Sequence, residues 1–359
     1  MDFSHPRHLR VGVLGCGPIA QAAHFESANK ARNAELYAIC DVAEDLLRRM
    51  AHTHAPTKTF LDYDEMLADP DLDAVIVATA DAFHVPAVKA ALAAGKHVLC
   101  EKPLGVSVEE VEDLRELVKR AGHVLQVGHM KRFDAGLQSA KAFVDGEMGE
   151  LLALKAWYCD STHRYEVTDA TQSLIVRSKN AKRPAIDPKA DRERYFLQTH
   201  GSHLVDTARY LGGEIAEVNA RLRQRFGAYC WFVEVTFANG AFGHLDLTIP
   251  VRMDWHEGFQ IYGENGSVLG KTYNPWLYKT SDVEIFHEAT GLTSRVLGAD
   301  GHFYRRQLEA FAETVLNGAP MAGADIDDGV ASVRALAAIA LSVTTRKPVR
   351  LDAVFESPA

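Results

Sequence analysis

Two side chains in this 359-residue sequence have the chemistry that oxidation of an alcohol requires. Lys102 follows the apolar run His97–Cys100, and side chains at the carboxyl ends of strands in open α/β sheets face the ligand crevice. An ammonium there can hydrogen-bond a hydroxyl and stabilise an alkoxide. His203 opens a helical stretch, and an imidazole near its normal pKa suits removal of a proton as a hydride leaves. The alternatives are a surface ion pair of Glu101 with Lys102 and a structural histidine at a helix start.

A glycine-rich loop near the start has the pattern of a dinucleotide site. The loop Gly15-Cys16-Gly17-Pro18-Ile19-Ala20 lies between an apolar run and a helical stretch. Gly15 permits a tight turn, Gly17 lets the backbone approach a pyrophosphate, and Ala20 allows close helix–strand packing. Asp41 lies 21 residues after Ala20, where an acid accepts hydrogen bonds from the adenosine ribose and repels the 2′-phosphate of NADP. The pattern favours NAD over NADP; the alternative is a tight turn in another kind of α/β protein.

The elements that must position these residues change character along the chain. The first third alternates short apolar runs with amphipathic stretches, which predicts a doubly wound parallel sheet. After about residue 130 the runs lengthen and alternate, and Asn239-Gly240 marks a hairpin. We therefore expect an α/β protein with a Rossmann domain at 1–128 and an α/β domain with an open-faced, mostly antiparallel sheet at 129–359. The predicted strands are 10–14, 35–40, 74–78, 97–100, 124–127, 151–159, 217–224, 231–238, 242–250 and 259–263, and the predicted helices are 19–30, 43–51, 86–94, 108–121, 133–145, 203–211, 303–316 and 326–345.

Composition excludes several classes of function. The chain is 47% hydrophobic with a net charge of −9, which disfavours nucleic acid as a partner because phosphate binding needs a basic surface. Its five cysteines are scattered and odd in number, so we expect neither disulfides nor a metal site. The first residues carry no signal-peptide pattern and no apolar run has the length of a membrane span, so we expect a cytoplasmic protein without membrane contact.

Several motifs together resemble one family, the glucose–fructose oxidoreductase/inositol dehydrogenase/MocA-like (Gfo/Idh/MocA) oxidoreductases. They are the glycine loop, Asp41, Thr79 to His84, Glu101-Lys102-Pro103, Val127 to Asp134 and Gly201 to Asp206. The resemblance implies NAD-linked oxidation of a sugar, cyclitol or related polyol, with Lys102 in the catalytic site and His203 as acid/base. The cofactor-binding positions it implies are Gly15, Gly17, Pro18, Ile19, Asp41, Thr79, Ala80, His84, Glu101 and Lys102.

The sequence departs from the family pattern at one point. Many members place an acid four residues before the histidine, whereas this chain has Thr199 there, followed by His200. We expect Thr199 to orient substrate through its hydroxyl and His200 to act as a second donor. Polyols need several polar partners, which adds further candidates for the substrate wall beside Lys102 and His203. These are His129, Lys131, Arg132, Tyr158, Asp160, His163 and Arg164, for each of which a solvated surface position is the alternative.

The stretch Asp160–Tyr195 is too long and polar for an ordinary loop. It holds eight Lys/Arg and six Asp/Glu, so it is locally basic. A subunit contact is the favoured interpretation, and an anionic group on the substrate is the alternative. An open sheet face also invites burial by a partner, so we expect a homodimer or homotetramer.

Three functions remain open from sequence. The first is an NAD-dependent dehydrogenase of a sugar, glycoside or cyclitol. The second is a nonredox enzyme that retains NAD, such as a glycosidase that acts by transient oxidation. The third is a protein that senses the NAD(H) pool without chemistry, against which Lys102 and His203 together argue.

Overall fold

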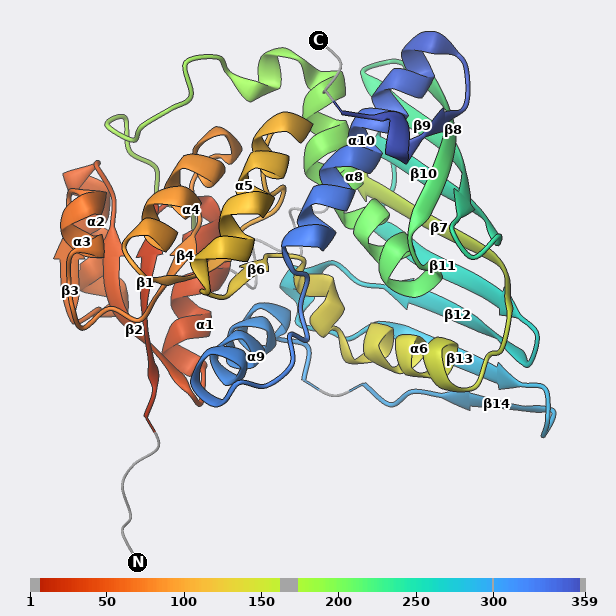
Figure 1. The fold of residues 1–359 in the computed structure, drawn as a ribbon, viewed down its shortest axis with the longest axis horizontal. Coiled ribbons are helices and arrows are strands. Elements are labelled where there is room, and N and C mark those ends of the chain that lie inside the picture. Colours follow the sequence, from red (N-terminus) through yellow and green to blue (C-terminus); the bar gives the residue numbers. More distant parts are fainter. Residues whose placement is uncertain (1–6, 162–173, 299, 356–359) are drawn as a thin grey trace, which may run out of the picture.

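The first domain is built on a parallel sheet of six strands in the order β3-β2-β1-β4-β5-β6 (Figure 1). The computed structural model describes residues 7–161, 174–298 and 300–355. The strands are β1 (Leu9–Leu14), β2 (Ala34–Cys40), β3 (Lys58–Phe60), β4 (Ala74–Val77), β5 (His97–Cys100) and β6 (Leu125–Val127). The connecting helices are η1 (Ala20–His24), α1 (Phe25–Lys30), α2 (Glu44–His54), α3 (Tyr63–Leu67), η2 (Asp81–Phe83), α4 (His84–Ala93) and α5 (Val108–Ala121). The doubly wound sheet predicted from the alternating runs is confirmed.

Helix α5 shows why this half was predictable. Ser107 and Glu110 form a reciprocal capping box at its start, Val111 and Leu114 are buried on one face, and Gly122 ends it with a φ of 69°. Its bounds match the predicted ones. Strand β3 and helix α3 were not predicted, because three and five residues are too short to show a period.

The second domain contains a nine-stranded mixed sheet in the order β14-β13-β12-β11-β7-β10-β9-β8-β15. Its strands pair antiparallel except for β7 with β10, and Asn239-Gly240 joins β9 to β10 as predicted. The strands are β7 (Leu151–Ser161), β8 (Ile215–Arg225), β9 (Ala228–Phe237), β10 (Phe242–Val251), β11 (His256–Gly263), β12 (Gly266–Thr272), β13 (Asp282–His287), β14 (Leu292–Arg295) and β15 (Val349–Arg350). The mostly antiparallel second sheet is therefore confirmed.

Helices cover one face of this sheet. Figure 1 shows α6, α8 and α10 side by side in front of it, and the other face leaves Phe232, Phe242, Leu269 and Phe286 exposed. The helices of this half are η3 (Met130–Phe133), α6 (Ala135–Gly146), η4 (Pro188–Ala190), α8 (Arg192–Gly212), η5 (Pro275–Leu277), α9 (Phe303–Asn317), α10 (Ile326–Thr345) and η6 (Leu351–Ala353). None of the helices in the described ranges has the length and apolar character needed to cross a bilayer.

Two features of the second half differ from expectation. Helix α8 begins at Arg192, where Asp191 caps it, so the predicted helix 203–211 was too short and His203 lies well inside the helix. Helix α9 returns to the first domain, where Leu308, Phe311 and Ala312 pack in the same core as β1. The division at residue 128 stays a prediction, with α9 serving the first sheet from the second half of the chain.

Candidate active site

A cavity of about 300 Å³ lies between the two domains, beyond the carboxyl ends of β1, β4 and β5. From the first domain it is lined by Ile19, Thr79, Asp81, His84, Glu101 and Lys102. From the second half it is lined by Met130, Lys131, Tyr158, Asp160, Thr199, His200, His203, Trp255, Pro275, Trp276 and Tyr304. The structure therefore gathers most of the predicted catalytic and substrate residues around one space, at the edge where open α/β sheets bind ligands.

The glycine loop has the shape that a dinucleotide needs. Gly15 has a φ of 93°, and a Cβ there would lie 2.9 Å from the carbonyl oxygen of Ala78, so only glycine fits. A Cβ on Gly17 would meet nothing within 4 Å, which leaves room for a phosphate. The Asp41 carboxylate accepts the backbone N–H groups of Cys16 and Ala43, each at 2.8 Å. These residues fit a dinucleotide, and Asp41 also braces the loop from the end of β2.

His84 and Glu101 hold the loops beyond β4 and β5. The His84 ring lies between two carbonyl oxygens, with Nδ1 2.7 Å from that of Pro103 and Nε2 3.2 Å from that of Thr79. Glu101 is buried and lies 2.8 Å from Nε2 of His24. Burial raises the pKa of Glu101, but the hydrogen bond and charge of His24 outweigh it and leave the pKa below its ordinary value. The alternative of a surface Glu101–Lys102 pair was therefore wrong.

Lys102 connects the two domains. Its Nζ donates a hydrogen bond of 3.0 Å to the carbonyl oxygen of Thr199 in α8. Enclosure by the surrounding protein lowers the pKa of Lys102, while the charges of Glu101 and Asp81 oppose that shift. Lys102 thus presents a partly desolvated ammonium to the cavity, with two further protons available for hydrogen bonds.

His203 faces the same cavity from α8. Its ring stacks on that of Tyr158, with centroids 5.8 Å apart and an angle of 4° between the planes. Enclosure lowers the pKa of His203 well below its ordinary value, and the charges of Lys102 and Lys131 add to the shift. The direction of this shift keeps the free imidazole neutral, which is the form a base needs, while making it a weaker base than an unperturbed histidine.

Thr199 and His200 take different surroundings. The hydroxyl oxygen of Thr199 is buried without a hydrogen-bond partner in the described part of the chain, and a buried hydroxyl without a partner is costly unless a ligand satisfies it. Nδ1 of His200 lies 3.4 Å from both the Tyr158 hydroxyl and a carboxylate oxygen of Asp160. Asp160 therefore places a carboxylate beside α8, although residue 199 of that helix is a threonine and not an acid.

Two of the predicted substrate residues do not line the cavity. Arg132 is buried in ion pairs with Asp206 and Asp328, each 2.7 Å at the shortest N–O distance. His129 is buried behind the cavity, 3.7 Å from Asp206, and its pKa is lowered to about 4 by burial. Asp206 therefore pairs with Arg132, although it shares a helix with His203. His163 and Arg164 lie outside the described residues.

Six lining residues were not predicted as site residues: Asp81, Met130, Trp255, Pro275, Trp276 and Tyr304. Trp276 and Tyr304 stack with centroids 5.7 Å apart, and Tyr304 meets the His24 ring edge-on. They come from a turn and a helix start far along the chain, where no local pattern marks them. The tryptophans and tyrosine give the polar cavity an apolar wall, of the kind on which a ring can pack.

Residues 174–183 cross the cofactor edge of the first domain. The backbone N–H and carbonyl of Val176 exchange hydrogen bonds of 2.9 Å with the Gln21 carboxamide. The Ser178 hydroxyl donates to Asp45 at 2.7 Å, and the Lys182 ammonium lies 5.0 Å from the centroid of Phe83. We call residues 174–183 the strap. This part of the stretch predicted as a subunit contact packs on its own chain.

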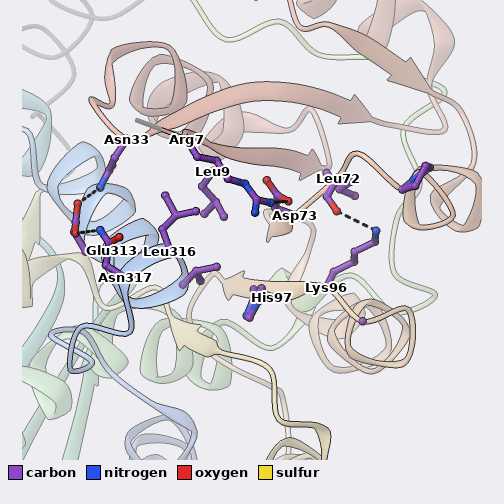
Figure 2. A pocket seen from close by; sticks show the side chains of 13 residues that line it. Arg7, Leu9, Asn33, Leu72, Asp73, Lys96, His97, Glu313, Leu316 and Asn317 are labelled. Carbon is purple, nitrogen blue, oxygen red and sulfur yellow. Dashed lines mark hydrogen bonds and ion pairs between the residues drawn. The ribbon is translucent and has the colours of Figure 1, made fainter. Parts of the chain in front are cut away.

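A second hollow, shown in Figure 2, is of another kind. It lies at the amino ends of β1 and β5, beside Leu9 and His97, away from the glycine loop. Arg7 there pairs with Asp73 at 2.6 Å, and Lys96 donates to the carbonyls of Asp69 and Leu72. Its cations are thus bound within the protein. Over the described residues, no cluster of three or more His, Cys, Asp or Glu is arranged to hold a metal ion.

Both halves of the chain match one family of known proteins. Residues 9–129 match a family described as oxidoreductases with an NAD-binding Rossmann fold, and residues 196–351 match its C-terminal α/β domain. The chain is 27% identical over 361 residues to the myo-inositol 2-dehydrogenase of Thermotoga maritima, covering 97% of this chain and 100% of that one. Two solved structures share the fold. A levoglucosan dehydrogenase in complex with NADH and levoglucosan has a TM-score of 0.78 at 21% identity, covering 96% of this chain and 100% of its own. An Agrobacterium radiobacter oxidoreductase in complex with NAD+, L-tartaric acid and magnesium has a TM-score of 0.79 at 17% identity, covering 96% and 99%.

Proposed function

Because this chain belongs to the Gfo/Idh/MocA oxidoreductase family and is an NAD(P)-dependent oxidoreductase acting on CH–OH groups, we propose that it oxidises a secondary alcohol of a sugar, glycoside or cyclitol with NAD. The observation that carries this proposal is the meeting of Lys102 and His203 at one cavity beside the glycine loop. The full-length likeness to a myo-inositol 2-dehydrogenase supports a polyol as substrate.

The proposed reaction divides the work between the two domains. Gly15 and Gly17 would hold NAD, which would supply the hydride acceptor for the carbon that bears the hydroxyl. His203, kept neutral by its enclosure, takes the hydroxyl proton on an imidazole nitrogen as the carbonyl forms. The Lys102 ammonium stabilises the negative charge that grows on the substrate oxygen. Each group has one role.

The cavity lining favours a substrate without charge. Lys102 and Lys131 are opposed by Asp81, Glu101 and Asp160 around the same space. An anionic substituent would meet more carboxylates than ammonium groups there, whereas hydroxyls find both donors and acceptors. We therefore propose a neutral polyol as the substrate in preference to an anionic sugar, which was the alternative suggested by the basic stretch Asp160–Tyr195. Thr199, whose buried hydroxyl has no hydrogen-bond partner among the described residues, is the proposed anchor for a hydroxyl beside the reacting one.

NAD is the proposed cofactor in preference to NADP. Asp41 stands at the end of β2 with its carboxylate fixed by two backbone N–H groups. A carboxylate held there accepts the ribose hydroxyls and repels a 2′-phosphate. Among the described residues each oxygen accepts one of these two hydrogen bonds, and a carboxylate oxygen has a second lone pair that can accept from the ribose.

The test is a panel of inositols, hexoses and glycosides with NAD and with NADP, read at the absorbance band of reduced nicotinamide at about 340 nm. NADH should accumulate with at least one neutral polyol, and NADPH much more slowly. His203→Ala and Lys102→Met should each abolish most of the rate, with Lys102→Arg as the matched variant that keeps the charge. Absence of turnover across the panel, or a fully active His203→Ala enzyme, would refute the assignment.

The strap supports a second candidate, an enzyme that retains NAD through a nonredox cycle. Val176 and Ser178 are tied to elements that follow β1 and β2, so a bound dinucleotide would lie beneath the strap. In that case the protein carries NAD through gel filtration and releases a sugar from a glycoside with no net NADH. Ser178→Ala should then speed NAD loss, whereas a protein that elutes free of nucleotide contradicts this candidate.

We also propose a homodimer or homotetramer in the cytoplasm. Phe232, Phe242, Leu269 and Phe286 are each more than 40% exposed on the sheet face that carries no helices, and a patch of this kind is typical of a subunit interface. A mass measured by light scattering at one protomer, at micromolar concentration, would contradict the assembly.

A further inference from the structure

Lys131 is a buried cation that the proposed chemistry does not use. Its side chain is 4% exposed and bonded to Glu257, which is 5% exposed. Burying a lysine and a glutamate together is costly, and replacing such a pair by apolar side chains is often neutral or stabilising. Lys131 itself lines the cavity, so stability alone is an insufficient reason for burying the pair there.

The Lys131 ammonium lies over an aromatic ring that also contacts the proposed base. Its Nζ is 4.5 Å from the centroid of Tyr158 and 5.7 Å from that of Trp255. Tyr158 in turn stacks on His203 almost parallel, while Trp255 packs edge-on against Tyr158 at 5.0 Å. Tyr158 is thus the ring that the ammonium and the imidazole share, and both contacts depend on its orientation.

We propose that Lys131 is a positioning residue for His203: held by Glu257, it fixes the Tyr158 ring, and that ring fixes the plane of the imidazole. The inference rests on the proposed role of His203 as the base. Lys131 also acts through its charge, which disfavours a second positive charge on the imidazole and lowers its pKa. Its effect is therefore both geometric and electrostatic.

Several groups share the electrostatic part and must be separated from Lys131. Lys102 faces His203 from the loop after β5, His129 from the loop after β6, and His200 from its own helix. Two anions lie one step further away, Asp160 against His200 and Glu257 against Lys131. Substitutions at the Lys131–Glu257 pair leave the other groups in place, so they isolate its contribution.

The experiment is a titration of His203 followed by NMR on the NAD-loaded enzyme labelled in its histidines, with the signal assigned by its loss in His203→Gln. We expect Lys131→Met to raise the pKa of His203 by about one unit or more. Lys131→Arg, which keeps the charge and the contact with the ring, should leave the pKa close to that of the wild type. The acidic limb of the kcat/KM profile should move in parallel.

Lys131→Met leaves Glu257 without its partner and is at risk of misfolding. Lys131→Met/Glu257→Gln removes both charges and should still raise the pKa of His203, because the Lys131 charge that lowers this pKa is lost. A folded double variant whose His203 titrates as in the wild type would overturn the proposal. The NMR titration needs no turnover, so it tests the role of Lys131 independently of the reaction. Failure to form NADH with any substrate would instead contradict the proposed function.

Discussion

Acid should destabilise this protein in part through a buried histidine, His129. His129 is buried, and burial lowers its pKa to about 4, against about 6.5 in an unfolded chain. The unfolded chain therefore binds a proton below about pH 6.5 that the folded protein binds only below about pH 4, so the free energy of unfolding falls across that window. Integrated down to about pH 5, this difference costs about 2 kcal/mol, and down to about pH 4 about 3 kcal/mol.

The measurement is urea unfolding of wild type and His129→Phe at about pH 7.5 and about pH 5, compared as the loss within each protein. Comparing each protein with itself cancels the change in packing. The wild type should lose about 2 kcal/mol more than the variant on acidification. Equal losses would show that the buried imidazole is protonated in the folded protein, with the nearby carboxylate of Asp206 as the reason.

Three other substitutions separate structural from functional roles. Arg132→Met should cost about 3–5 kcal/mol in unfolding free energy, because it leaves Asp206 buried and unpaired, with KM unchanged in the folded fraction; a raised KM at unchanged stability would return Arg132 to the substrate site. Thr199→Val should lower kcat/KM by about tenfold without loss of stability, since its hydroxyl has no protein partner in the described structure; a lower melting temperature with normal kinetics would count against it. Asp41→Ser should raise the ratio of NADP to NAD turnover by roughly tenfold or more, and an unchanged ratio would place the cofactor preference elsewhere.

Most of the first domain could be predicted from the sequence because the patterns that mark its elements are local. The capping box Ser107–Glu110 and the buried face of α5 lie within one helix, and the glycine loop lies within one turn. The start of α8 was missed for the opposite reason. Its first turn, Arg192 to Arg194, is charged and exposed, so this turn shows no apolar period that would mark the start of a helix.

The site was predictable where a residue follows a strand and not where it comes from tertiary packing. Lys102 follows a strand that the apolar run predicts. Trp276 and Tyr304 line the cavity only because the later part of the chain folds back against the first domain. Arg132 shows the converse. A polar residue near the domain junction suggested substrate contact, but its guanidinium is fully engaged by Asp206 and Asp328, which only the fold brings together.

The hydrogen bond from Lys102 to the Thr199 carbonyl shows that the site depends on how the two domains are placed relative to each other. The ammonium belongs to a loop of the first sheet and its acceptor to the helix that carries His203. Helix α9 stabilises this placement, because it packs in the hydrophobic core of the first domain. Its Arg306 donates a hydrogen bond to the carbonyl of Phe133, and its Gln307 donates one to the carbonyl of Val127. A shift between the domains would pull Lys102 from Thr199 and separate the ammonium from the imidazole. The return of α9 to the first domain is therefore part of what holds the two reacting groups at one cavity.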